Sequence, residues 1–143
     1  LQLIYGLRES LKMLFEEGLD NVYARHFRLA EGVRQAIKAW GLNLCAQSPE
    51  LYSHTVSAIY VPKGFDSNKL TNHAFSKYGV SFGIGLGEMH GKAFRIGHLG
   101  SLTDTMVLSG LATIEMAMAD LDYPIELGEG VRAAQSYFRA TAA

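Results

Sequence analysis

The sequence has only one cysteine and no long apolar run, and each of these two features excludes a class of protein. One cysteine among 143 residues rules out an internal disulfide framework and is typical of a reducing compartment, so we expect a cytoplasmic protein. That residue, Cys45, lies among small and apolar neighbours, and we interpret it as a buried hydrophobic side chain rather than a nucleophile. No apolar stretch approaches the roughly 20 residues that a membrane-spanning helix needs.

Charge and metal-ligand patterns are also sparse. The formal net charge is −1, and lysine and arginine form no cluster that would mark a surface for nucleic acid or for an anionic membrane. No two histidines have the i, i+4 spacing of many zinc sites. We therefore expect no nucleic-acid partner, no membrane partner and no bound metal.

The remaining pattern is that of a single domain, residues 1–143, long enough to bury a core. Apolar residues at helical spacing predict helices, and runs of β-branched or aromatic residues predict strands. Helices are expected at 4–17, 20–40, 66–78, 101–118 and 124–138, and strands at 42–46, 55–61, 80–82 and 93–96. This order predicts an α+β fold, with a small, mostly antiparallel sheet that helices cover on one side.

Capping signals set several of these boundaries. Gly18 and Gly79 are natural helix ends, because glycine readily adopts the left-handed conformation found there. Asp20 is expected to cap the second helix, Ser101–Asp104 resembles a capping box, and Pro124 is expected to begin the last helix.

The second predicted helix carries Arg25, Arg28, Arg34 and Lys38 beside its apolar stripe. A basic patch for an acidic partner is one interpretation. We favour a solvated helix face, because charged residues along a helix usually face water. Trp40, at the end of this helix, is expected to anchor a core or an interface.

The segment Phe94-Arg95-Ile96-Gly97-His98-Leu99-Gly100 is the most informative motif. It places one arginine in a short extended run, followed by glycines that let a backbone or a ligand approach. A guanidinium is always charged, and its planar fork binds a carboxylate through two hydrogen bonds. Arg95 is therefore a candidate receptor for the carboxylate of a small acid. The alternative is a structural arginine paired with an acidic residue of the chain itself.

Three neighbouring features are weaker signals. Gly83-Ile84-Gly85-Leu86-Gly87 suggests a phosphate-binding loop, but no helix start or nucleotide-binding motif follows it, so a connection between two strands is favoured. His98 is interpreted as a hydrogen-bonded structural histidine, with acid–base catalysis as the alternative. His90 lies in a predicted loop and is assigned no role.

The stretch Tyr78–Glu88, the short link Gly91–Ala93 and the Arg95 motif resemble, in this order, the C-terminal domain of class V pyridoxal-phosphate aminotransferases. They are most similar to the serine–glyoxylate and alanine–glyoxylate group. Four N-terminal runs look like the same family: Tyr5–Leu11, Glu16–Leu19, Ala24–His26 and Leu29–Glu31. In this family the arginine of the Arg-Ile-Gly-His block binds the substrate carboxylate, and the resemblance implies that role for Arg95.

The resemblance implies the small C-terminal domain of a fold-type I enzyme, with the large cofactor-binding domain absent from a chain that begins at Leu1. It implies pyridoxal 5′-phosphate in the full-length parent, a small amino-acid or 2-oxo-acid substrate and a homodimer. The implied reaction moves an amino group from serine or alanine to glyoxylate. Without the larger domain, we expect apolar surface on the first helix and on the sheet edge.

The motifs of this chain do not include the residues that bind and use the cofactor in such an enzyme. A transaminase needs a lysine that forms a Schiff base with the cofactor. None of the lysines stands in the family's lysine motif: Lys12, Lys38, Lys63, Lys69, Lys77 and Lys92. We therefore expect no cofactor bound to this chain alone and no activity of its own. The alternative is a non-catalytic module that binds a small carboxylate or forms a dimer.

Overall fold

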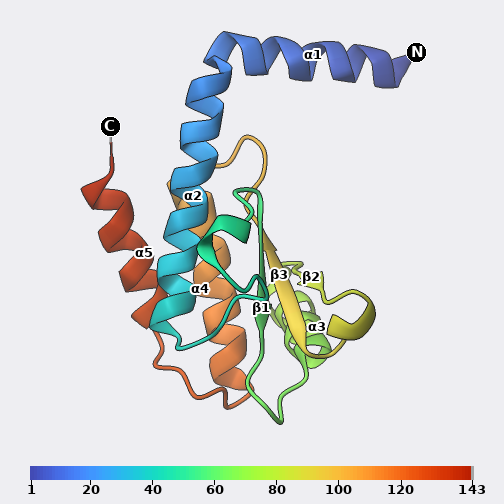
Figure 1. The fold of residues 1–143 in the computed structure, drawn as a ribbon. Helices are drawn as coiled ribbons and strands as arrows, with labels where there is room; N and C mark the ends of the chain where they lie inside the picture. The colour runs from blue at the N-terminus through green and yellow to red at the C-terminus, as the bar shows by residue number, and fades with distance from the viewer. Residues whose placement is uncertain (143) are drawn as a thin grey trace.

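A computed structural model describes residues 1–142, in which helices pack against a three-stranded antiparallel sheet (Figure 1). The predicted α+β fold is confirmed. None of the helices within the described residues is long and apolar enough to cross a membrane. In chain order the elements are α1 (Gln2–Glu17), α2 (Leu19–Ala39), β1 (Val56–Tyr60), α3 (Ser67–Tyr78), β2 (Gly83–Ile84), β3 (Ala93–Gly97), α4 (Asp104–Asp120) and α5 (Glu129–Ala140), with short 3₁₀ helices at Pro49–Leu51 and Gly87–Met89.

The sheet has the strand order β1–β3–β2, with β3 in the centre. Its inward side chains include Ile59, Phe94 and Ile96, which are at most 6% exposed. They belong to one apolar core with residues of α2, α3 and α4, among them Val33, Leu70, Leu111 and Met118. The helices therefore cover one face of the sheet, as the sequence predicts, and side chains that alternate with the inward ones lie on the other face.

α1 and α2 meet at Gly18, whose φ of 84° is accessible mainly to glycine. The predicted helix end at Gly18 is confirmed. The predicted cap at Asp20 is wrong, because Gly18 is itself the N-cap of α2 and Asp20 lies inside the first turn. No residue of α1 is buried, and Figure 1 shows this helix extending away from the rest of the domain. Its exposed apolar side chains include Leu3, Ile4, Leu7, Leu11, Met13 and Phe15.

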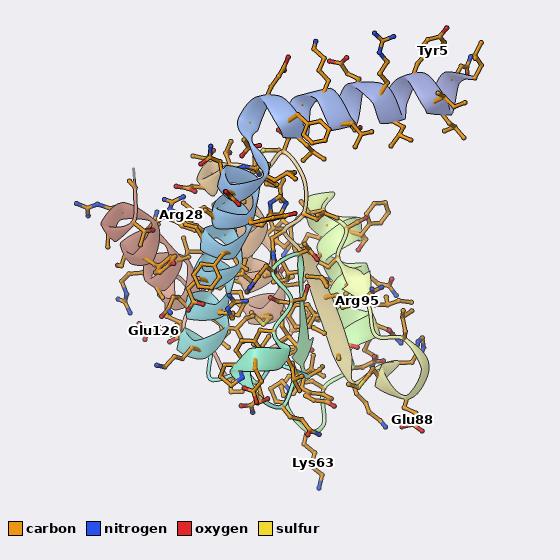
Figure 2. The ribbon with its side chains drawn as sticks, turned by 45° about the horizontal axis from the view of Figure 1, so that its top comes forward. Tyr5, Arg28, Lys63, Glu88, Arg95 and Glu126 are labelled. Carbon is orange, nitrogen blue, oxygen red and sulfur yellow. The ribbon has the colours of Figure 1, made fainter. Side chains whose placement is uncertain are left out.

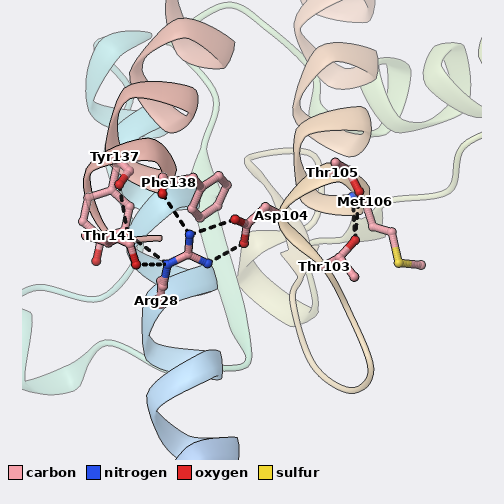
Figure 3. Close-up of polar contacts among 8 residues, drawn as sticks. All are labelled: Arg28, Thr103, Asp104, Thr105, Met106, Tyr137, Phe138 and Thr141. Carbon is pink, nitrogen blue, oxygen red and sulfur yellow. Dashed lines mark hydrogen bonds and ion pairs between the residues drawn. The ribbon is translucent and has the colours of Figure 1, made fainter. Parts of the chain in front are cut away.

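Arg28 of α2 ties together the start of α4 and the end of α5 (Figure 3). Its Nη1 and Nη2 donate to the two carboxylate oxygens of Asp104 at 2.5 and 2.8 Å. Its Nε donates to the carbonyl and the hydroxyl of Thr141, and Nη2 also donates to the carbonyl of Phe138. The three guanidinium nitrogens of Arg28 thus all donate to groups within the domain, which makes Arg28 a structural residue.

The predicted solvated cationic face of α2 is wrong for its arginines. Arg25 pairs with Glu17 at 2.6 Å, and Arg34, which is only 8% exposed, pairs with Glu31 at 2.8 Å. Lys38 alone of the predicted set is exposed without an ion pair in residues 1–142. Glu31 lies on α2 itself, whereas the partners of Arg25 and Arg28, Glu17 and Asp104, come from other helices, which the charge pattern of α2 does not reveal.

Two predicted strands are displaced or reduced. Residues 42–46 make a single bridge, from Leu44 to Ile59, because the chain bends away from β1 after that point. The strand predicted at 80–82 is found at 83–84 as β2, since only there does the chain lie alongside β3. The strand predicted at 55–61 is confirmed as β1.

The helix signals of the C-terminal half are partly right. Thr103 caps α4 and accepts a hydrogen bond from the Met106 amide at 3.3 Å. The predicted capping box from Ser101 to Asp104 is wrong, because Asp104 is the first residue of α4 and its carboxylate pairs with Arg28. Met106, in the first turn of α4, is 54% exposed. α5 begins at Glu129 and not at Pro124, because Gly128, in the left-handed conformation, is its N-cap.

Candidate functional site

Arg95 stands on β3, the central strand, opposite Ala58 of β1 and Gly83 of β2. Its neighbours Phe94 and Ile96 point into the core, so the alternation of the strand turns Arg95 toward the opposite face. Figure 2 shows Arg95 beside the sheet, on the other side of the domain from Arg28. A strand that is paired on both edges holds this side chain on a well-supported backbone.

The side chain of Arg95 lies across β2. Its Nε donates a hydrogen bond to the carbonyl oxygen of Ile84 at 3.0 Å. The terminal nitrogens Nη1 and Nη2 have no hydrogen-bond partner within residues 1–142. One edge of the guanidinium is therefore anchored to the backbone, while its end-on edge, with two parallel N–H donors, is free to receive a planar anion.

No carboxylate of residues 1–142 lies within ion-pair distance of Arg95. The arginines of α2 behave differently, since Arg25, Arg28 and Arg34 each pair with an acidic residue. A half-buried arginine without such a partner keeps its charge available. The alternative was a structural arginine paired with an acidic residue of the chain itself, and no acidic residue within residues 1–142 pairs with Arg95.

A cavity with a volume of about 700 Å³ lies elsewhere, between α2 and the segment 41–54. Arg34 forms part of its lining, and Arg95 does not. The Arg34 guanidinium carbon lies 5.9 Å from the ring centroid of Phe27 and 5.5 Å from that of Tyr52, and its Nε is bound to Glu31. The charge of Arg34 is thus satisfied inside the domain, so it is a weaker anion receptor than Arg95.

His98 is fully buried and both of its ring nitrogens have partners. Nδ1 donates to the carbonyl of His54, and Nε2 lies 3.0 Å from the Ser57 hydroxyl. Burial lowers the pKa of His98 to about 4, against the partly offsetting hydrogen bond to His54. A neutral imidazole at neutral pH accepts from Ser57, so His98 fastens the end of β3 to the start of β1. The predicted hydrogen-bonded structural histidine is confirmed.

The remaining motif residues show no site chemistry. His90 is exposed and accepts a hydrogen bond from the Asn68 amide at 2.8 Å. Cys45 is partly rather than fully buried, and burial raises the pKa of its thiol, which disfavours the thiolate that a nucleophile needs. The stretch from Gly83 leads through β2 into a 3₁₀ helix, so a strand connection is found there rather than a loop before an α-helix. No cluster of three or more potential metal ligands occurs in residues 1–142.

No protein-family model matches the chain, but individual relatives match nearly all of it. The chain is 61% identical to the L-aspartate–glyoxylate aminotransferase of Paracoccus denitrificans and 55% identical to the serine–glyoxylate aminotransferase of Hyphomicrobium methylovorum, in each case over 99% of its length. Among solved structures, the pyridoxamine–pyruvate aminotransferase of Mesorhizobium loti is 34% identical, with a TM-score of 0.89 over 96% of this chain. The chain belongs to the class V aminotransferases.

This class V segment spans only about a third of its relatives: 36% of the first, 35% of the second and 35% of the solved structure. The described residues do not fit pyridoxal phosphate, because a Schiff-base lysine needs a low pKa that burial provides. All the lysines are exposed, and a hydrogen bond with Asp120 raises the pKa of Lys77. We therefore assign no residue of this chain to the cofactor.

The sequence motif identifies Arg95 but not what positions it. The carbonyl of Ile84 and the bare backbone of Gly83 both lie beside its side chain. The signal for them is the glycine-rich run that precedes the motif. That run shows a close backbone approach but not its partner, because strand register cannot be read from it.

Proposed function

We propose that this chain is the C-terminal, substrate-carboxylate-binding domain of a pyridoxal-phosphate-dependent aminotransferase that transfers an amino group to glyoxylate. Arg95 is the receptor for the carboxylate of the amino-acid donor and of the 2-oxo-acid acceptor. The names of two relatives, L-aspartate–glyoxylate and serine–glyoxylate aminotransferase, support glyoxylate as acceptor. Serine, alanine and aspartate are the donors that the proposal includes.

One observation carries the role of Arg95: its guanidinium is anchored through Nε and has no ion-pair partner in residues 1–142. A fixed cation with a free two-donor edge binds a carboxylate at little conformational cost, since the side chain is already ordered. Because Nε is engaged with Ile84, the carboxylate is accepted end-on by Nη1 and Nη2. The same contact serves amino acid and 2-oxo acid, because both carry the carboxylate.

The rest of the active enzyme lies outside this chain in the proposal. The cofactor, when bound to the complete protein, supplies the electron sink for the reaction. This chain contributes substrate binding and orientation through Arg95. We propose a homodimer as well, because the exposed apolar face of α1 fits a covered position in an assembly. A cytoplasmic location, suggested by the lone cysteine, belongs to the same proposal.

The test of the reaction uses the full-length protein that carries this segment. It is incubated with glyoxylate and with ¹⁵N-labelled serine, alanine or aspartate, and labelled glycine is measured. The proposal expects labelled glycine from at least one donor. If no donor gives labelled glycine although the protein is folded and loaded with cofactor, transfer to glyoxylate is ruled out.

A non-catalytic module that binds small carboxylates is the second candidate, because the anchored guanidinium of Arg95 serves binding as well as catalysis. Such a module binds glyoxylate or serine without turnover. Calorimetric binding that depends on Arg95, together with no labelled glycine, would favour this candidate.

A further inference from the structure

We infer that Gly83 is a positioning residue for Arg95: the missing side chain at position 83 lets the guanidinium lie over β2 with its carboxylate-binding edge free. The inference rests on the proposed function of Arg95. It adds a determinant of substrate recognition that the Arg-Ile-Gly-His motif does not contain.

The geometry at position 83 is close. Gly83 is the direct partner of Arg95 in the β2–β3 ladder. A Cβ at Gly83 would lie 3.1 Å from the Arg95 Cβ, 3.2 Å from its Nε and 3.4 Å from its Cζ. Directly opposed residues of an antiparallel pair normally hold their Cβ atoms about 4.5–5.5 Å apart. A side chain at position 83 therefore has no room unless Arg95 or β2 moves.

Gly83 leaves room for Nε and Cζ of Arg95, the atoms that orient the two terminal nitrogens of the guanidinium. Nε must reach the Ile84 carbonyl, one residue along β2, to make its hydrogen bond of 3.0 Å. The side chain of Arg95 passes directly over Gly83 on the way, which is why both Nε and Cζ lie near the missing Cβ. Gly83 and the Ile84 carbonyl therefore act together. Gly83 leaves room for the Arg95 side chain to cross β2, and the Ile84 carbonyl fixes the position of its Nε.

Displacement of the Arg95 guanidinium is expected to weaken binding of the substrate carboxylate strongly. Two parallel hydrogen bonds to a carboxylate require both terminal nitrogens in one plane with it. A misplacement of about 1 Å at such a contact can reduce a rate on the order of 100-fold. A methyl group at position 83 requires shifts of a few tenths of an ångström, so we expect a loss on the order of 10-fold, and a larger one for a β-branched side chain.

Gly110, in the interior of α4, provides the control. It lies in a helix that packs on the core face of the sheet, opposite the face that carries Arg95, its φ is not in the left-handed region, and a Cβ there meets nothing within 4 Å. Gly110→Ala therefore introduces the same glycine-to-alanine change without touching the Arg95 side chain.

The experiment uses the full-length protein with Gly83→Ala, Gly83→Val and Gly110→Ala, each made with Arg95 intact and in an Arg95→Ala background. The readout is the ratio of kcat/KM for serine to that for ethanolamine, which lacks the carboxylate. With Arg95 intact, we expect this ratio to fall on the order of 10-fold in Gly83→Ala, further in Gly83→Val, and less than about twofold in Gly110→Ala. In the Arg95→Ala background, the Gly83 substitutions should leave the ratio unchanged.

Each other outcome decides a different question. If Arg95→Ala alone leaves the ratio unchanged, the proposed function of Arg95 fails, and the inference fails with it. If Arg95→Ala lowers the ratio and Gly83→Ala does not, the proposed function stands and only the inference is overturned. A Gly83 effect that persists without Arg95, or a Gly83→Ala protein that does not fold, also overturns it, because Gly83 then acts on something other than the orientation of Arg95.

Discussion

The indole of Trp40 and the carboxylate of Glu115 meet inside the domain, where Trp40 Nε1 donates to Glu115 Oε1 at 2.8 Å. The same oxygen accepts the backbone amide of Gly130 at 2.8 Å. Trp40 and Glu115 are 3% and 1% exposed, so this carboxylate joins the end of α2, the middle of α4 and the start of α5 in a dry environment. Such a buried polar group stabilises a fold only when its partners are in place.

Gly130→Ala is expected to destabilise the domain. A Cβ at Gly130 overlaps Nε1 and Cε2 of Trp40, so the ring must move away from Glu115. Overpacking of this kind costs about 1–3 kcal/mol, and loss of the buried hydrogen bond adds about 1 kcal/mol. Urea unfolding measures the change.

The control for this prediction is Gly110→Ala, in the interior of α4, where an added Cβ meets nothing within 4 Å. We expect that protein to be as stable as the wild type, or more stable by up to about 1 kcal/mol, because alanine favours a helix over glycine. Equal effects of the two substitutions would contradict the packing described for Trp40.

Stability should fall in mild acid because of His98. Burial lowers its pKa from 6.5 to about 4, so between these values the unfolded chain binds a proton there and the folded chain does not. This contribution to stability is complete above pH 6.5 and is lost as the pH falls toward 4, up to about 3 kcal/mol.

The measurement is the free energy of unfolding at pH 7 and pH 4.5 for the wild type and for His98→Gln. The variant is less stable at pH 7, because its side chain cannot keep both contacts of the ring. Its further loss on acidification should be smaller than that of the wild type. An unchanged loss would mean that His98 is not the group responsible.

Local features of this fold can be predicted from the sequence, and contacts between distant segments cannot. Gly18 and Gly79 end helices through their own backbone conformation, which needs no knowledge of the rest of the chain. The ion pair of Arg28 cannot be predicted in this way, because its partner Asp104 lies 76 positions away and the helix pattern of α2 gives no sign of it.

The same division applies to the candidate site. The role of Arg95 was predicted from its motif and stays a prediction, while its place on a buried strand follows from the apolar residues on either side. The neighbourhood of its side chain depends on the register of β2 against β3, which pairs Gly83 with Arg95. β2 is too short for hydrophobic alternation to specify that register, so only the structure provides it.

The isolated chain is expected to self-associate through α1. This helix buries none of its residues, and several of its apolar side chains are more than half exposed, including Leu7 at 60%. Contact between such faces removes apolar surface from water. The sedimentation coefficient should therefore rise with concentration in the wild type and much less in Leu7→Glu.

Ser10→Glu adds the same charge to the same exposed helix without removing an apolar group. We expect it to associate as the wild type does. A wild-type chain that stays monomeric at high concentration would argue against a covered face on α1 and would favour a stand-alone binding module.

The isolated chain should not form a stoichiometric adduct with pyridoxal phosphate. Its lysines are exposed, and the hydrogen bond with Asp120 raises the pKa of Lys77 and outweighs the lowering by burial. Absorbance after mixing should show only weak adducts that dialysis removes. A stable one-to-one band that mass spectrometry maps to a single lysine would refute the absence of a cofactor site in this chain.

The central claim, that Arg95 holds the substrate carboxylate, is tested most directly in the full-length protein with Arg95→Lys and Arg95→Ala. Lysine keeps the charge but loses the fork, and alanine loses both. A bidentate, charge-assisted contact contributes roughly 2–4 kcal/mol, so kcat/KM for serine should fall on the order of 30- to 1000-fold. Arg132→Lys, on the exposed side of α5 and without an ion pair in residues 1–142, is the matched control and should have no effect.

The deciding measurement is kcat/KM for serine and for ethanolamine in the wild type and in Arg95→Ala. The account predicts a large loss for serine and almost none for ethanolamine, with the cofactor absorbance unchanged. Equal losses for the two substrates, or loss of folding without a change in their relative rates, would contradict it and make Arg95 a structural residue.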